Sequence, residues 1–175
     1  MYRHVLTAPP SPIHPSPIRL LSGLLLAVAL LCADAAHSVD SNADPVAQIL
    51  AGDAAPAGVV FEIVSGDSAY LALALPRIEA LSARLRERFP GLAVAVVSHG
   101  GEQFALASAA TQDNTAAHES AQSLLADDVP VHVCGTHAGW RGLAAEDFPD
   151  YIDVAPSGPA QIRAYRDLGY LLVDI

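Results

Sequence analysis

The sequence contains no lysine, and its nine Lys-or-Arg positions are all arginine, against 19 acidic residues. The formal net charge is −10, and no cluster of basic residues interrupts the acidic chain. Such a chain should repel the phosphates of nucleic acids and anionic lipid head groups, so we expect neither as a partner. Genome composition is a sufficient explanation for the missing lysine, which therefore carries no functional weight.

Sequence signatures of several enzyme classes are also lacking. We find no nucleophile elbow, phosphate-binding loop or dinucleotide-binding fingerprint. Cysteine is scarce, with only Cys32 and Cys134 among 175 residues. The composition is 52% hydrophobic and 16% charged, which excludes disorder over most of the chain. The length predicts one domain with an appendage.

The first 35 residues have the pattern of a secretory signal peptide. The apolar run at 20–31 is shorter than the roughly 20 residues that a transmembrane helix needs. Arginines precede it, and Ala33 and Ala35 supply the small residues of a cleavage site. We therefore predict export to the periplasm and no membrane contact after cleavage, although retention of the leader as an anchor stays open. Residues 36–57 are predicted to be a flexible linker with one short helical turn near 46–50.

After cleavage Cys134 would be the one cysteine left, so no internal disulfide could form in the oxidising compartment that export implies. A lone thiol there is either deeply buried or kept for chemistry.

Residues 58–175 are predicted to form an α/β domain. Apolar, β-branched runs predict five buried strands, at 59–64, 92–97, 129–134, 151–154 and 170–173. Helical patterns lie between them, at about 71–88, 114–126 and 159–168, with a weaker one at 102–110. In the first of these helices, Pro76 is expected to introduce a kink or a restart. Strands alternating with helices predict a three-layer Rossmann-like domain with a mainly parallel five-stranded sheet.

Two loops at the carboxyl ends of these strands carry reactive residue types, and ligand sites gather at this edge of such sheets. One loop holds His99. The other begins at Cys134, and a helical turn starting there would point its positive end at the sulfur. His137 and Arg141 follow at distances from which either cation could stabilise a thiolate, the reactive form of cysteine. The alternative is that Cys134 is a small buried hydrophobic residue that ends a core strand.

A metal site is a second interpretation of the same loops. His132 and Cys134 are two residues apart on a strand and therefore point to one face. His137 and His99 could approach from the neighbouring loops. Three imidazoles and a thiolate are ligands that suit copper or zinc. The pattern is generic, and otherwise we expect no cofactor.

The segment Val131-His132-Val133-Cys134, followed by Arg141-Gly142-Leu143, resembles the DsrE/DsrF family, which includes the TusD-type sulfur relay subunits. The stretches at 156–162 and 168–170 resemble that family's last helix and strand. The resemblance spans 58–175, and its motifs are moderately specific. The histidines at 132 and 137 depart from the relay pattern, as does the predicted export.

The resemblance implies a compact domain that assembles into trimers or hexamers and carries a persulfide on Cys134. We therefore expect an exported sulfur-carrier or sulfurtransferase-like protein, with Arg141 and His137 stabilising the sulfur anion. Its sulfur donor and acceptor are unknown. The alternatives are a periplasmic metal-binding module that uses His132, Cys134 and His137, and a non-catalytic subunit of a homo-oligomer.

Overall fold

The computed structural model describes residues 44–175. The predicted signal peptide and the start of the predicted linker lie outside the described residues. Within 44–175, none of the helices combines the length and apolar character that crossing a membrane requires.

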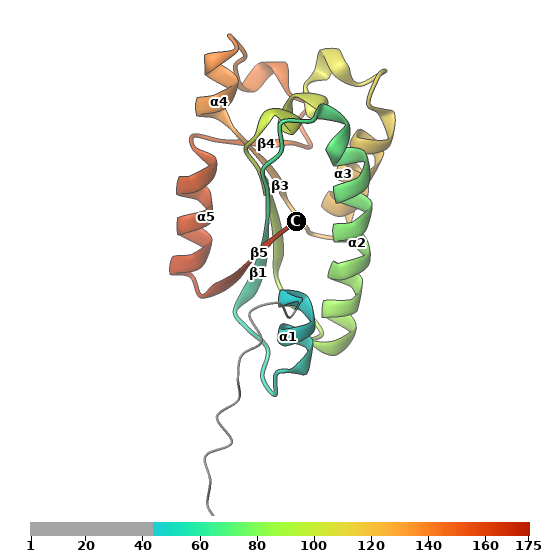
Figure 1. The fold of residues 1–175 in the computed structure, drawn as a ribbon, viewed down its shortest axis with the longest axis vertical. Helices are drawn as coiled ribbons and strands as arrows, with labels where there is room; N and C mark the ends of the chain where they lie inside the picture. Colours follow the sequence, from blue (N-terminus) through green and yellow to red (C-terminus); the bar gives the residue numbers. More distant parts are fainter. Residues whose placement is uncertain (1–43) are drawn as a thin grey trace, which may run out of the picture. The chain divides into compact units, whose positions relative to one another are not determined.

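The centre of the structure is a five-stranded sheet (Figure 1). Its strands have the order β4-β3-β2-β1-β5, and all four pairings are parallel. The strands are β1 (Gly58–Ile63), β2 (Val94–Ser98), β3 (Val131–Cys134), β4 (Asp153–Ala155) and β5 (Tyr170–Asp174). The prediction of a mainly parallel five-stranded sheet is confirmed. Parallel strands need crossover connections, and the helices between the apolar runs provide them.

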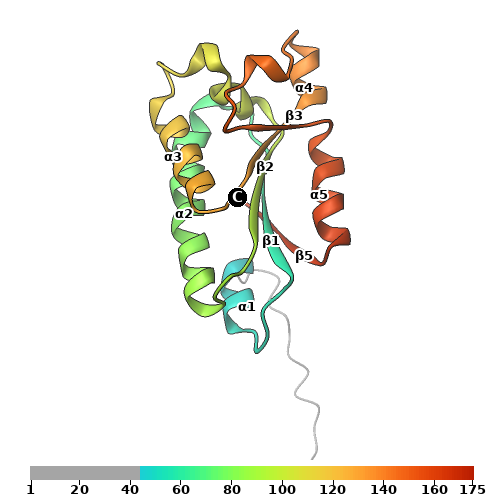
Figure 2. The ribbon, with the colours of Figure 1, turned by 180° about the vertical axis from the view of Figure 1, so that it is seen from behind.

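Helices cover both faces of this sheet and make three layers (Figures 1 and 2). One face carries α1 (Pro45–Ala51), α2 (Leu71–Arg88) and α3 (Thr115–Ala126), and the other carries α5 (Gly158–Asp167). A short helix, α4 (Gly135–Trp140), follows β3 directly. The remaining turns are the 3-10 segments η1 (Ser68–Tyr70), η2 (Gly101–Leu106), η3 (Ser108–Ala110) and η4 (Ala145–Asp147).

The alternation of side chains along the strands divides the core in two. In β1, Val59, Phe61 and Ile63 belong to the larger cluster under α2 and α3, whereas Val60 belongs to the smaller cluster under α5. All four are completely buried. Successive strand residues point to opposite faces, so a continuous apolar run is what a strand covered on both faces requires.

The helix α1 falls inside the predicted linker. Asp44 caps it by accepting a hydrogen bond from the main-chain N–H of Val46 (3.0 Å). Val46 and Ile49 are buried in the larger core cluster. Residues 45–51 are therefore part of the packed structure.

Of the kink or restart predicted at Pro76, the restart is wrong, because α2 runs through that residue without interruption. Pro76 lies on the exposed side of the helix, where water can replace the hydrogen bond that proline cannot donate.

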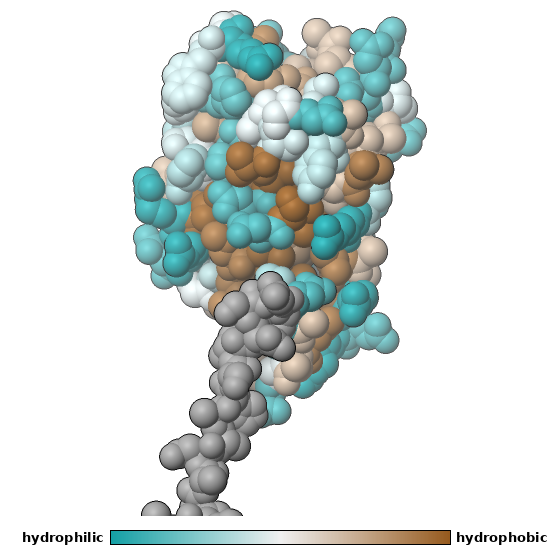
Figure 3. All heavy atoms as spheres, in the orientation of Figure 1, coloured by the Kyte–Doolittle hydropathy of each residue, from teal (hydrophilic) through white to brown (hydrophobic). Residues whose placement is uncertain are grey.

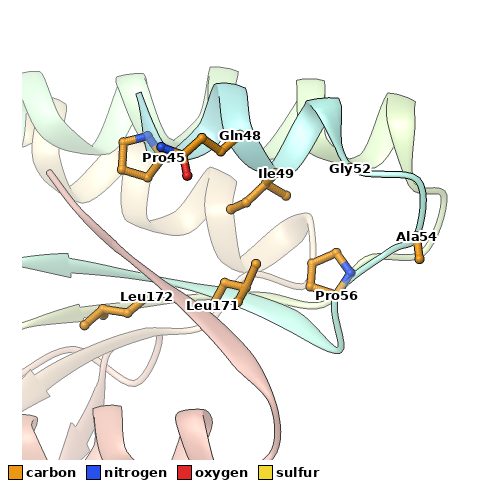
Figure 4. A pocket seen from close by; sticks show the side chains of 8 residues that line it. All are labelled: Pro45, Gln48, Ile49, Gly52, Ala54, Pro56, Leu171 and Leu172. Carbon is orange, nitrogen blue, oxygen red and sulfur yellow. The ribbon is translucent and has the colours of Figure 1, made fainter. Parts of the chain in front are cut away.

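Apolar side chains reach the surface between the two helix layers, as the brown area in the middle of Figure 3 shows. The edge strand β5 runs there, and its Leu171 is 44% exposed. A hollow of about 390 Å³ lies between β5 and α1 (Figure 4), lined by Pro45, Gln48, Ile49, Gly52, Ala54, Pro56, Leu171 and Leu172. None of the described residues that line this hollow has a titratable side chain.

Candidate functional site

Cys134 is the last residue of β3 and the N-cap of α4. Its Sγ accepts a hydrogen bond from the main-chain N–H of His137 (3.4 Å), and the residue is only 5% exposed. Gly135 makes this abrupt strand-to-helix change feasible, because a Cβ there would lie 3.0 Å from the carbonyl oxygen of Ala155 in the neighbouring strand. The sulfur therefore sits at a carboxyl strand end with a main-chain donor directed at it.

The main chain of Cys134 is held by a buried amide side chain. Gln103, in η2, is completely buried. Its Oε1 accepts from the N–H of Cys134 at 2.7 Å, and its Nε2 donates to the Cys134 carbonyl at 3.4 Å. One side chain thus satisfies the main-chain donor and contacts the main-chain acceptor of Cys134, which fixes where β3 ends.

The neighbouring residue of η2, Glu102, connects the loops that follow β1 and β2. Its carboxylate is fully buried and accepts three hydrogen bonds, from Ser65 N–H (2.6 Å), Ser98 Oγ (2.7 Å) and Gly100 N–H (2.9 Å). A side chain at Gly100 would collide with this carboxylate and with the main chain of Ser65. The three donors compensate for the burial of the charged group and hold both loops beside Cys134.

A pocket of about 320 Å³ opens at Cys134. Imidazole, hydroxyl, indole and pyrrolidine groups line it together with the thiol, from His99, Cys134, Thr136, His137, Trp140, Ser157 and Pro159. The structure thus brings together three of the predicted site residues: His99, Cys134 and His137.

His137 is fixed within this pocket. Its Nδ1 lies 3.0 Å from the carbonyl oxygen of His99 and must donate, because a carbonyl can only accept. The imidazole ring makes a T-shaped contact with Phe104 at 5.0 Å and a tilted contact with Trp140 at 5.6 Å between centroids. Trp140 itself is 79% exposed. In the neutral form of His137, the remaining ring nitrogen, Nε2, therefore carries the lone pair.

Arg141 does not line the pocket. Its guanidinium carbon lies 4.4 Å from the centre of the Phe104 ring, in a cation–π arrangement. Arg141 follows the last residue of α4, and this position carries it to the outside of η2. The side chain of Arg141 is therefore linked to the pocket through Phe104, which also contacts His137.

His132 is buried on the α5 side of the sheet, and both its ring nitrogens face side chains outside the Cys134 pocket. Nδ1 lies 2.8 Å from Oδ2 of Asp153, and Nε2 lies 2.7 Å from the hydroxyl of Tyr165. Asp153 is its direct partner across β3 and β4. Burial lowers the pKa of His132 below its ordinary value of 6.5, and the Asp153 carboxylate offsets part of this effect. Burial raises the pKa of Tyr165.

The predicted metal ligands are consequently not assembled. Among residues 44–175 no group of three or more His, Cys, Asp or Glu side chains is arranged to hold a metal ion. His132 is directed to Asp153 and Tyr165, while His99 and His137 stay in the Cys134 pocket.

Sequence reasoning missed Glu102, Gln103 and Phe104, which position this site. A weak helical pattern was all that it assigned to 102–110. The signal in the sequence was the pair of polar residues directly after Gly100-Gly101, in a segment that lacks the regular polar–apolar pattern of a surface helix. Their partners lie up to 37 residues away in the chain, so their roles depend on the tertiary structure.

Comparison with known proteins gives a structural likeness and no sequence relative. No protein-family model matches the chain, and no curated protein matches it. Its structure is similar to that of MTH1491 from Methanobacterium thermoautotrophicum, described as a protein of unknown function, with a TM-score of 0.55 and 19% identity over 67% of this chain and 97% of that one. The ychN protein from E. coli aligns with a TM-score of 0.48 and 15% identity, over 67% and 99% of the two chains. The chain therefore shares its fold with MTH1491.

Proposed function

We propose that this chain is an exported DsrE/DsrF-like sulfur carrier that holds a persulfide on Cys134. One observation carries the proposal: the Sγ of Cys134 lies at a pocket, accepts a main-chain hydrogen bond from His137, and shares that pocket with two imidazoles. The fold likeness to MTH1491 agrees with the family that the sequence resembles. A thiolate needs such donors, because the anion is the nucleophile in sulfur exchange.

The loading step is an attack on a sulfane sulfur. The Cys134 thiolate forms a new S–S bond to the outer sulfur of the donor, and the donor's own bond to that sulfur breaks. With thiosulfate as donor, sulfite leaves with the electron pair of the broken bond. The product is the Cys134 persulfide, and charge is conserved because the thiolate and thiosulfate become a persulfide anion and sulfite.

Incubation with thiosulfate followed by intact-mass spectrometry tests this proposal. We expect a mass increase of one sulfur atom, removed by a thiol reductant and absent in Cys134→Ser. A second incubation with glutathione persulfide covers persulfide donors, whose leaving group is a thiol. An unchanged mass with both donors, in protein whose Cys134 remains a free thiol, would refute sulfur carriage.

The remaining parts of the proposal concern location and assembly. We infer that the chain is released to the periplasm after removal of residues 1–35, and that it forms a homo-oligomer. Intact mass of protein recovered from the periplasm reports the new N-terminus, and native mass spectrometry reports the number of copies. Elemental analysis of the same sample tests the alternative metal-binding role, which would require a stoichiometric copper or zinc content that survives dialysis.

A further inference from the structure

The Cys134 pocket contains a histidine, His99, whose ring contacts the partly buried carboxylate of Glu62. Nε2 of His99 lies 2.7 Å from Oε1 of Glu62, and their side chains are only 16% and 22% exposed. Glu62 belongs to β1 and His99 directly follows β2, the neighbouring strand. Glu62 was not among the residues that the sequence singled out, and it has no part in the sulfur-carrier proposal.

Three restraints hold His99 in place. Its main-chain N–H donates to the carbonyl of Ile63 (3.1 Å), and its carbonyl accepts from Nδ1 of His137. Its Cβ packs so closely on Gly158, at the start of α5, that a Cβ on this glycine would lie 2.5 Å away. With the ring nitrogen on Glu62, neither the position nor the orientation of the imidazole is free.

The contact with Glu62 also determines which nitrogen of His99 is available. An ionised carboxylate can only accept, so the Nε2 of His99 carries a hydrogen and donates it. In the neutral imidazole Nδ1 is then the acceptor. When Nδ1 takes a proton, the carboxylate stabilises the resulting imidazolium. This is how a third group orients the base of an activated nucleophile.

We infer that Glu62 is a positioning residue that holds His99 as the acid–base group of the Cys134 pocket, an inference that rests on the proposed function. Nδ1 of His99 takes the proton of the Cys134 thiol, and the thiolate attacks the outer sulfur of the donor. The donor's bond to that sulfur breaks. Where the leaving group is a thiolate, the imidazolium returns the proton to it, so one persulfide and one thiol result.

His137 is the other titratable neighbour, and its contacts assign it a different part. Its Nδ1–H is already donated to the His99 carbonyl, and its main-chain N–H is donated to the sulfur. Among residues 44–175, no carboxylate accepts a hydrogen bond from its ring. Within the same residues, of the two imidazoles only the ring of His99 has a carboxylate that would stabilise its protonated form.

The test compares Glu62→Gln with the natural chain across pH. The amide keeps an acceptor for His99 but removes the negative charge, so the fold should be retained. We expect the rate of Cys134 alkylation by iodoacetamide to fall about tenfold at pH 7 and to recover to the natural rate near pH 10, where a thiol ionises without a base. A purely structural role would change the rate by a similar factor at every pH. Glu119→Gln is the matched control, because Glu119 carries an exposed carboxylate on α3.

His99→Gln provides the second variant. Its alkylation rate should fall at least as far at pH 7, and adding Glu62→Gln to it should cause no further loss, because the carboxylate acts through the imidazole. If Glu62→Gln unfolds, His99→Gln alone decides by the same pH profile. Equal rates in Glu62→Gln and Glu119→Gln at pH 7 would overturn the inference, as would full additivity in the double variant.

The same samples separate this inference from the sulfur-carrier proposal. If Glu62→Gln slows alkylation only near neutral pH and no variant gains sulfur from thiosulfate or glutathione persulfide, then Glu62 and His99 activate the thiol and sulfur carriage fails. If sulfur is gained at equal rates by Glu62→Gln and the natural chain, sulfur carriage stands and the role of Glu62 fails.

Discussion

Replacing Gln103 by methionine removes the amide that holds the Cys134 main chain and leaves the side-chain volume nearly unchanged. The N–H of Cys134 then loses its 2.7 Å acceptor in a site that water does not reach, since Gln103 is completely buried. A buried donor left without a partner costs about 1–3 kcal/mol. The contact of Nε2 with the carbonyl is longer, at 3.4 Å, and adds at most about 1 kcal/mol.

Urea unfolding measures this loss. With a slope of roughly 1–3 kcal/mol per molar urea, a loss of about 2 kcal/mol lowers the midpoint by about 1 M. Gln112→Met is the matched control, because Gln112 is exposed in the loop before α3. Hydrogen exchange at the Cys134 amide should accelerate in Gln103→Met and stay unchanged in the control. A midpoint within about 0.2 M of the control would show that the amide clamp does not stabilise this strand end.

Three further predictions concern the fold around the site. Because burial lowers the pKa of His132 below 6.5, the unfolded chain binds more protons than the folded one just below pH 6.5. The free energy of unfolding should therefore fall as the pH is lowered through 6.5. His132→Gln should make this fall smaller in urea titrations at several pH values. Gly158→Ala should destabilise the fold by about 1–3 kcal/mol, because the new methyl meets His99. Gly139→Ala has open space around it in α4 and should stabilise the fold by about 0.5–1 kcal/mol. Changes of the same sign in the thermal unfolding temperature of both variants would contradict this packing. Glu102→Gln directs an amide N–H₂ at one of three donors and should cost about 1–3 kcal/mol by urea unfolding, and an unchanged midpoint would show that the carboxylate does not hold the two loops.

The strands were predictable because burial on both faces leaves a direct record in the sequence. The runs at 59–64 and 170–173 differ from β1 and β5 by at most one residue at either end. The end of β3 was predictable too, because glycine follows Cys134 and allows the close approach to β4. These features are local, so the chain alone specifies them.

The partners of the site residues were less predictable, because they depend on register and on crossover geometry. His132 shares a strand face with Cys134 as the alternation predicts, yet it faces Asp153, which lies opposite it across β3 and β4. Arg141 is near enough in sequence to reach Cys134, but the end of α4 turns it onto Phe104. A spacing of charged residues cannot distinguish such outcomes before the helices are placed.

The six residues of η2 serve three strand ends at once, since Glu102 holds the loops after β1 and β2, and Gln103 holds the end of β3. For anyone who re-engineers this protein, an insertion in that hexapeptide would therefore disturb three strand ends together. The solvent-exposed stretch around Gln112, a few positions further on, has no such ties and is the place to attach a fluorophore or a new loop.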